Sequence, residues 1–160
     1  MEKPLQGLRV IELGQLLAGP FAGCMLGYFG AEVIKVEPPG GDPIRNWREV
    51  KDGTSLWWRS LARNKKCISV NLKTEEGRAL VKELLLDADI VIENFRPGVM
   101  ESWGFKYKTN IIWYKIRKDG GPDRRGVGFY FRNVTEVVLF GVKGSMRTLQ
   151  KGRSQENIIL

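Results

Sequence analysis

The chain has 160 residues, of which 42% are hydrophobic and 28% are charged, and its formal net charge is +8 at pH 7. This length and composition suit one globular domain that can bury a core. The sequence contains no histidine, which excludes a Ser-His or Cys-His catalytic couple and a histidine-ligated metal site, so we predict no metal. No apolar run approaches the roughly 20 residues that a membrane span needs. The two cysteines lack the spacing of a disulfide framework, which favours free thiols and a cytoplasmic location.

The first predicted elements form a βαβ unit of about 30 residues. Residues 8–13 have the length and apolar composition of a buried strand, and residues 32–37 predict a second strand. Between them, residues 20–29 predict a helix that begins at a proline and is followed by a glycine cap. These elements imply two parallel strands joined by a right-handed crossover. The apolar residues at helical spacing, which we expect to face the sheet, are Phe21, Met25, Leu26 and Phe29.

The loop between the first strand and the helix, residues 14–19, begins and ends with glycine. It lies at the carboxyl end of a strand and before a helix N-terminus, where free N–H groups favour phosphate or another anion. The alternative is a tight turn whose glycines only relieve backbone strain. The loop matches neither a G-x-G-x-x-G fingerprint nor a Walker loop, because no Lys-Ser/Thr pair follows Gly19.

The next segment is less regular. Residues 42–54 predict a long polar loop, which is either a ligand lid or a surface excursion. Ser55 is a candidate N-cap for a short helix over residues 56–62. A basic turn then leads into a predicted strand over residues 67–72.

Alternation of helices and strands continues up to Gly104. Thr74 is a candidate N-cap for a helix over residues 74–86, which carries an apolar stripe. Residues 89–93 predict another buried parallel strand, and a short helix over residues 97–103 follows. The order of elements predicts the α/β class, with a doubly wound, Rossmann-like and mostly parallel sheet.

The charge distribution predicts a boundary near residue 104. Residues 1–104 hold 14 Lys+Arg and 14 Asp+Glu, whereas residues 105–160 hold 12 Lys+Arg and 4 Asp+Glu and therefore carry the whole net charge. We predict one domain over residues 1–104 and a divergent basic tail over residues 105–160. The elements expected in the tail are strands at residues 110–116, 126–131 and 135–140 and a mobile end at residues 150–157.

Three blocks of the first part carry a resemblance. They read LLAGPFAGCMLGYFGAEVIKVEPPGGDPIRNW over residues 16–47, NKKCISVNLK over residues 64–73 and ADIVIENFRPGV over residues 88–99. In order and spacing, over residues 4–104, they resemble the N-terminal part of the class III coenzyme A-transferases. This CaiB/BaiF family includes formyl-CoA and carnitine CoA-transferases and the related α-methylacyl-CoA racemases.

The resemblance implies the transfer of coenzyme A from an acyl-CoA to a carboxylic acid through a covalent aspartyl intermediate. Coenzyme A or acyl-CoA is then a substrate, and no tightly bound cofactor is implied. The implied partners are acyl-CoA and carboxylic acid substrates, and no membrane. Family members are homodimers, but a chain of 160 residues lacks the C-terminal half that links the two subunits.

The resemblance also places coenzyme A contacts on three segments of this sequence. Lys65, Lys66 or Lys73 are candidates to meet the coenzyme A phosphates, which need cationic partners. Pro38 and Ser102 stand where some family members carry arginine. The contacts carried over by position are Leu17, Ala18, Val70, Asn71, Leu72, Lys73, Asn94, Phe95 and Arg96.

The catalytic residue is unknown from the sequence. The family's aspartate follows an Arg-x-Gly-Tyr-Asp-like segment that does not occur here, and Asp119 and Asp123 lie in a Lys/Arg/Gly-rich context. We therefore expect a truncated or frameshifted, inactive fragment that binds coenzyme A, and whether the chain is an enzyme stays open. One alternative is a racemase-like member, although the racemase proton shuttle uses histidine. Another alternative is a nucleic-acid-binding module built on the basic, aromatic tail. For this tail we favour the interpretation of an out-of-frame or poorly folded end.

Overall fold

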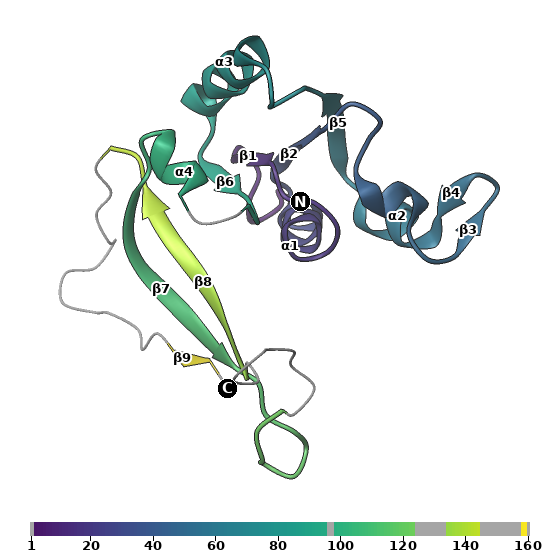
Figure 1. Ribbon diagram of the computed structural model, residues 1–160, viewed down its shortest axis with the longest axis vertical. Helices are drawn as coiled ribbons and strands as arrows, with labels where there is room; N and C mark the ends of the chain where they lie inside the picture. The colour runs from purple at the N-terminus through teal and green to yellow at the C-terminus, as the bar shows by residue number, and fades with distance from the viewer. Residues whose placement is uncertain (1, 96–97, 124–133, 145–157, 160) are drawn as a thin grey trace. The chain divides into compact units, whose positions relative to one another are not determined.

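The chain folds into two units, Met1–Arg96 and Pro97–Leu160, each with its own sheet (Figure 1). The division lies slightly upstream of the boundary that the charge distribution predicts. The computed structural model describes residues 2–95, 98–123, 134–144 and 158–159.

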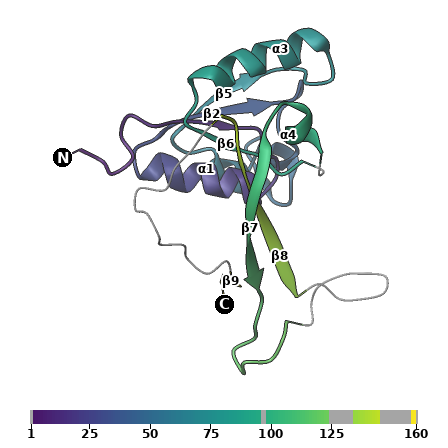
Figure 2. The ribbon, with the colours of Figure 1, turned by 90° about the vertical axis from the view of Figure 1, so that its left-hand side faces the viewer.

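The sheet of the first unit confirms the predicted fold class. Its four strands have the order β5-β2-β1-β6, and every neighbouring pair is parallel. Helices α1 (Ala18–Tyr28) and α3 (Glu75–Leu84) cover opposite faces of this sheet, as Figure 2 shows, so the unit is doubly wound. The strands are β1 (Arg9–Glu12), β2 (Glu32–Glu37), β5 (Lys65–Ser69) and β6 (Ile90–Ile92).

The apolar face of α1 differs from the prediction. Phe21 and Phe29 are 56% and 54% exposed, whereas Met25 and Leu26 are half-buried. Leu26 packs against the core cluster under the helix, which also contains Val10, Ala31, Val33 and Ile90. The residues of α1 that are buried are Gly19, Pro20, Gly23, Cys24 and Gly27.

The reason for this difference is the closeness of α1 to the sheet. A methyl group on Gly23 would lie 2.0 Å from Glu12 Oε2, so only a face of small residues fits there. Both faces of α1 are apolar at helical spacing, and periodicity does not distinguish a close-packed face from an exposed one. Cys24 is 2% exposed and lies in the core.

The segment between β2 and β5 forms short elements instead of one long loop. Ser55 caps α2 as predicted, because its Oγ accepts a hydrogen bond from the Trp57 amide at 3.1 Å. The rings of Trp47 and Trp57 lie 5.7 Å apart, which joins the two ends of the segment. Its elements are η1 (Pro43–Asn46), β3 (Val50–Lys51), β4 (Thr54–Ser55) and α2 (Leu56–Leu61).

Two other predicted boundaries are shifted. The strand expected over residues 67–72 is β5, which ends at Ser69, because Asn71 and Thr74 then form a turn in which the Thr74 amide donates to Asn71 O. Thr74 caps α3 as predicted, with its Oγ1 accepting from the Gly77 amide at 3.1 Å. A short 3-10 turn, η2 (Leu85–Asp87), completes the predicted helix.

The second unit contains a three-stranded sheet of order β8-β7-β9, in which β7 pairs antiparallel with β8 and parallel with β9. The strands expected at residues 110–116 and 135–140 are therefore confirmed. The strand expected at residues 126–131 and the mobile end at 150–157 lie outside the described residues. The elements are α4 (Val99–Ser102), β7 (Lys106–Tyr114), β8 (Thr135–Val142) and β9 (Ile158–Ile159).

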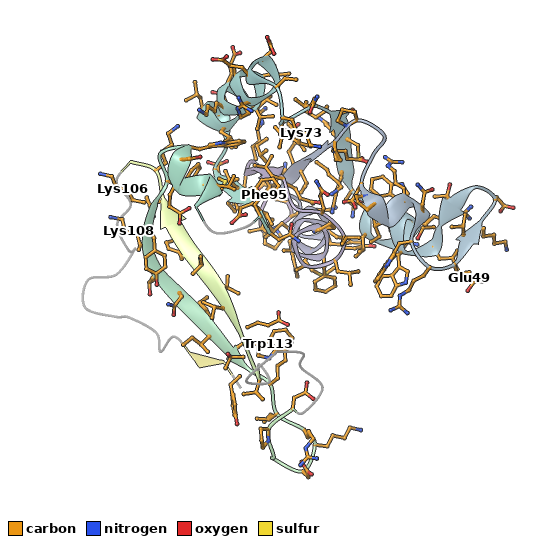
Figure 3. All side chains as sticks on the ribbon, in the orientation of Figure 1. Glu49, Lys73, Phe95, Lys106, Lys108 and Trp113 are labelled. Atoms are coloured by element: carbon orange, nitrogen blue, oxygen red, sulfur yellow. The ribbon has the colours of Figure 1, made fainter. Side chains whose placement is uncertain are left out.

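Both faces of the β7–β8 hairpin carry exposed apolar side chains. Val137 and Val138 are 54% and 55% exposed, and successive residues of a strand point to opposite faces. Lys106 and Lys108 project from the beginning of β7 and Trp113 from its end (Figure 3). Across the described ranges of the chain, no helix is long and apolar enough to cross a membrane.

Candidate functional site

The predicted coenzyme A contacts gather at one edge of the first unit's sheet. Because β1, β5 and β6 are parallel, the loops that follow their carboxyl ends meet at the same edge. Lys73 follows β5 and Phe95 follows β6 (Figure 3). Arg96 lies outside the described residues. The described predicted contacts at this edge are Leu17, Ala18, Val70, Asn71, Leu72, Lys73, Asn94 and Phe95.

Asn94 fixes the loop that follows β1. Its Oδ1 accepts a hydrogen bond from the Gln15 amide at 2.9 Å, and its Nδ2 donates to Gln15 O at 2.9 Å. This pair joins the ends of β1 and β6, where the strand order reverses, the usual ligand-binding place in an open α/β sheet. Asn94 therefore shapes the loop with both polar atoms of its side chain.

The next loop residue, Leu16, is held in a left-handed backbone conformation with φ at +65°. Its amide donates to Asp42 Oδ1 at 3.1 Å. The amides of Gln15 and Leu16 thus bind protein side chains, so the loop does not offer these two N–H groups to an anionic ligand. The amides of Ala18 and Gly19 begin α1, where first-turn N–H groups have no carbonyl four residues earlier in the helix.

A buried lysine lies directly under this loop. The Lys35 side chain is 1% exposed, and its Nζ donates to Gly14 O at 2.8 Å and to Glu12 Oε1 at 2.9 Å. The same Nζ forms an ion pair with Asp42 Oδ2 at 2.8 Å. The loop carbonyl of Gly14 and two buried carboxylates therefore share one ammonium group.

Lys65, which the resemblance offered as a phosphate ligand, lies beneath α1 instead. Its side chain is fully buried, forms an ion pair with Glu12 Oε2 at 2.6 Å and donates to Pro20 O at 2.6 Å. Burial lowers the pKa of Lys65, while the Glu12 carboxylate opposes that shift. The prediction for Lys65 is wrong, because its ammonium group is enclosed between the sheet and the helix.

The loop after β5 is held by its own turn and by α3. Asn71 O accepts from Thr74 Oγ1 at 3.0 Å, and Asn71 Oδ1 accepts from the Lys73 amide at 3.1 Å. Arg78 Nη1 donates to Lys73 O at 2.9 Å. These bonds fix the backbone and leave the side chain of Lys73 exposed.

A third buried carboxylate, Glu37, ends β2 at the same edge. The Arg45 guanidinium binds it through Nε and Nη2 at 2.7 and 2.8 Å, and the Asp42 amide donates to it at 2.8 Å. The guanidinium also lies 3.6 Å from the Trp58 ring centroid. Burial opposes the ionised form of Glu37, but Arg45 and the Asp42 amide together hold its pKa below the usual value.

We expect Arg45→Met to weaken the acid dependence of stability. A carboxylate whose folded-state pKa is lowered stabilises the fold above its unfolded-state pKa, about 4.3, and that stabilisation is lost as the pH falls through the folded-state value. Without Arg45 the folded-state pKa of Glu37 rises, so the urea midpoint at pH 7 falls and the difference between pH 7 and pH 3 shrinks. Arg48→Met, which removes the guanidinium over Trp47, is the control. Equal changes in both variants would contradict the assignment.

Sequence reasoning missed the buried charges Glu12, Lys35 and Asp42. The available signal was a charged residue inside each of two otherwise apolar strands, VIEL and VIKV. Such residues are rarely buried unless they are paired, and their partners here come from neighbouring strands and loops. Within the described residues, no group of three or more His, Cys, Asp or Glu side chains is arranged to hold a metal ion.

Comparisons with known proteins identify the family of the chain. The model of CoA-transferase family III matches residues 5–110. The succinyl-CoA–D-citramalate CoA-transferase of Chloroflexus aurantiacus is 51% identical over 137 residues, which cover 79% of this chain and 34% of that protein. The human succinyl-CoA:glutarate CoA-transferase is 46% identical over 154 residues, which cover 90% of this chain and 34% of that protein. The chain thus spans about a third of the length of these curated relatives.

Solved structures show the same similarity. A CAIB/BAIF family protein from Brucella suis has a TM-score of 0.59 at 42% identity and covers 65% of this chain and 29% of that one. A hypothetical protein from Mycobacterium tuberculosis has a TM-score of 0.57 at 43% identity, and the match covers 64% of this chain and 28% of that one.

A second family model, MT-A70, matches residues 61–160. The two matches overlap over residues 61–110, where β5 and β6 complete the parallel sheet of the first unit. Of these two models, only MT-A70 reaches residues 111–160, for which the sequence offered no resemblance.

The match over residues 5–110, the CoA-transferase relatives and the two solved neighbours lead to one conclusion: the chain belongs to CoA-transferase family III.

Proposed function

We propose that the first unit binds coenzyme A at the carboxyl edge of its sheet, as part of an enzyme that moves coenzyme A from an acyl-CoA to a carboxylic acid. The observation that supports this is that the loops after β1 and β6 are hydrogen-bonded to each other where the strand order reverses, while the loop after β5 lies at the same end of the sheet. The first-turn amides of α1 and the exposed ammonium of Lys73 are the groups there that suit phosphate.

The substrate class follows from the names of the relatives. The Chloroflexus and human proteins are named for succinyl-CoA as donor and for D-citramalate or glutarate as acceptor. We therefore propose a dicarboxylic acyl-CoA donor and a dicarboxylic acid acceptor. The homodimer that the family resemblance implies belongs to the same proposal, and would cover exposed side chains of α1 such as Phe21.

No nucleophile is assigned among the described residues. Asp119 pairs with Arg117 at 3.0 Å, and its Oδ1 accepts from the Gly121 amide within a surface turn. A carboxylate held in this way by its own turn on the surface is poorly placed to attack a thioester. The proposal for this chain is therefore one of binding, and transfer chemistry is a property proposed for the whole enzyme.

We expect the 160-residue chain to bind coenzyme A and Lys73→Ala to weaken that binding by about tenfold, because a lost charge-assisted hydrogen bond commonly has this effect. Isothermal titration with coenzyme A and with succinyl-CoA measures the affinity. Lys66→Ala is the matched control, since Lys66 is an exposed lysine whose ammonium binds Glu32 at 2.6 Å, at the amino end of β2 and away from the proposed site. Absence of binding by the unaltered chain, or an equal loss in both variants, would refute the proposed site.

A further inference from the structure

Two buried lysines lie on the same face of neighbouring strands, and their contacts differ in one respect. Lys35 on β2 and Lys65 on β5 both pair with Glu12, one at each carboxylate oxygen. The remaining contact of Lys65 is Pro20 O on α1, whereas Lys35 binds Gly14 O in the loop that follows β1. Only one of these two ammonium groups therefore acts on the loop.

The effect of Lys35 continues through Asp42. One oxygen of this carboxylate pairs with Lys35, and the other accepts the amides of Leu16 at 3.1 Å and Ile44 at 2.9 Å. Asp42 is 1% exposed, so neither contact is replaced by bulk water. A single buried charge thus holds one loop carbonyl directly and one loop amide through its partner.

These contacts set the orientation of two successive peptide planes. In a trans peptide the C=O and N–H point in opposite directions. In the first plane, the Gly14 carbonyl accepts from Lys35 and the Gln15 amide donates to Asn94. In the second plane, the Gln15 carbonyl accepts from Asn94 and the Leu16 amide donates to Asp42. Leu16, which follows these two planes, has φ at +65°, a conformation that side-chain-bearing residues rarely adopt.

We propose that Lys35 is a positioning residue of the coenzyme A site: its buried ammonium, acting with Asp42, holds the loop over residues 14–17 in the conformation that presents the first turn of α1 to the ligand. The inference rests on the proposed function for the identity of the ligand. The role of Lys35 in the loop itself rests on the contacts alone, and the experiment separates the two.

The experiment compares Lys35→Met with Lys65→Met in the full 160-residue chain. Both variants remove one buried ammonium from Glu12, so both lower the unfolding midpoint. Hydrogen exchange of the Gln15 and Leu16 amides, followed by NMR at a temperature where both variants are folded, measures how firmly the loop is held. Isothermal titration measures the affinity of the site for coenzyme A. Lys35→Met is expected to accelerate exchange of the Leu16 amide. It is also expected to weaken the binding of coenzyme A by about tenfold or more, because loss of a group that orients binding residues commonly has this effect. Lys65→Met is expected to leave both readouts close to those of the unaltered chain.

Equal changes in the two variants would show that Lys35 acts only through stability and would overturn the inference. If the unaltered chain does not bind coenzyme A, the proposed function fails, while the exchange data still decide whether Lys35 holds the loop.

Asp42→Asn replaces Lys35→Met in the exchange experiment if Lys35→Met does not fold. It removes the charge but keeps the shape, and is expected to accelerate exchange of the Leu16 amide while the Gln15 amide, held by Asn94, stays protected. Loss of protection at both amides, or at neither, would contradict the arrangement.

Discussion

Replacing Glu12 by glutamine is expected to lower the free energy of unfolding by about 3–5 kcal/mol, the usual loss when one partner of a buried ion pair is removed. The Glu12 side chain is fully buried and binds both Lys35 and Lys65. After the change, Lys35 keeps its ion pair with Asp42, whereas Lys65 keeps its hydrogen bond to the Pro20 carbonyl and loses its ion pair. A loss of this size is large against a total stability of about 5–15 kcal/mol.

Glu32→Gln is the matched control for this prediction, measured by urea unfolding at pH 7. Glu32 also binds two cations, Lys66 and Arg9, which lower its pKa to about 2. It lies at the opposite end of the sheet and is accessible to water, so solvent screens both pairs and we expect little change. Similar losses in the two variants would show that burial of Glu12 does not set its contribution.

Gly77→Ala is expected to cost about 1–3 kcal/mol and to weaken coenzyme A binding, because the added methyl group overpacks a fixed contact. A Cβ at this position would lie 2.1 Å from Asn71 O, a backbone atom that cannot rotate away. The turn at Asn71 would have to shift, and with it the backbone that places Lys73. An alanine is otherwise the better helix former, so the loss cannot come from helix propensity.

Thermal unfolding and titration with coenzyme A test the effect of Gly77→Ala. Glu83→Ala is the control, because Glu83 is an exposed residue in the last turn of the same helix and its acidic side chain is not favoured there. We expect the control to retain both stability and affinity. A Gly77→Ala variant as stable as the unaltered chain would show that the contact with Asn71 relaxes freely.

The two family matches overlap over residues 61–110, so they do not mark a single boundary in the chain. The first unit contains the parallel sheet and all the described contacts proposed for coenzyme A. The second contains β7 and β8, and its residues beyond 110 fall only under the MT-A70 model of the two. The change in charge near residue 104 lies close to the start of the second unit and to the end of the CoA-transferase match, whereas the MT-A70 match begins within the first unit.

The fold class and the family could be predicted from the amino-acid sequence alone. Parallel strands buried on both faces leave a nearly continuous apolar run, and caps such as Ser55 and Thr74 act within a few residues, so these features can be read locally. The family blocks were equally accessible, because they are contiguous stretches of sequence. They place the expected contacts at one sheet edge once parallel pairing is assumed.

The buried face of α1 and the identity of the buried charges became clear only from the packing of the folded chain. The apolar period of α1 admits two faces, and the close approach of Gly23 to Glu12 selects the one made of small residues. Lys65 in a basic turn reads as a phosphate ligand until its pairing with Glu12, 53 positions earlier in the chain, places it beneath a helix. The contribution of a buried charge depends on partners that come from other strands and loops. Those partners meet only when the sheet has formed. A charged residue in an apolar strand is therefore a local signal of burial, but it cannot show that Glu12, Lys35, Asp42 and Lys65 pair with one another under the loop.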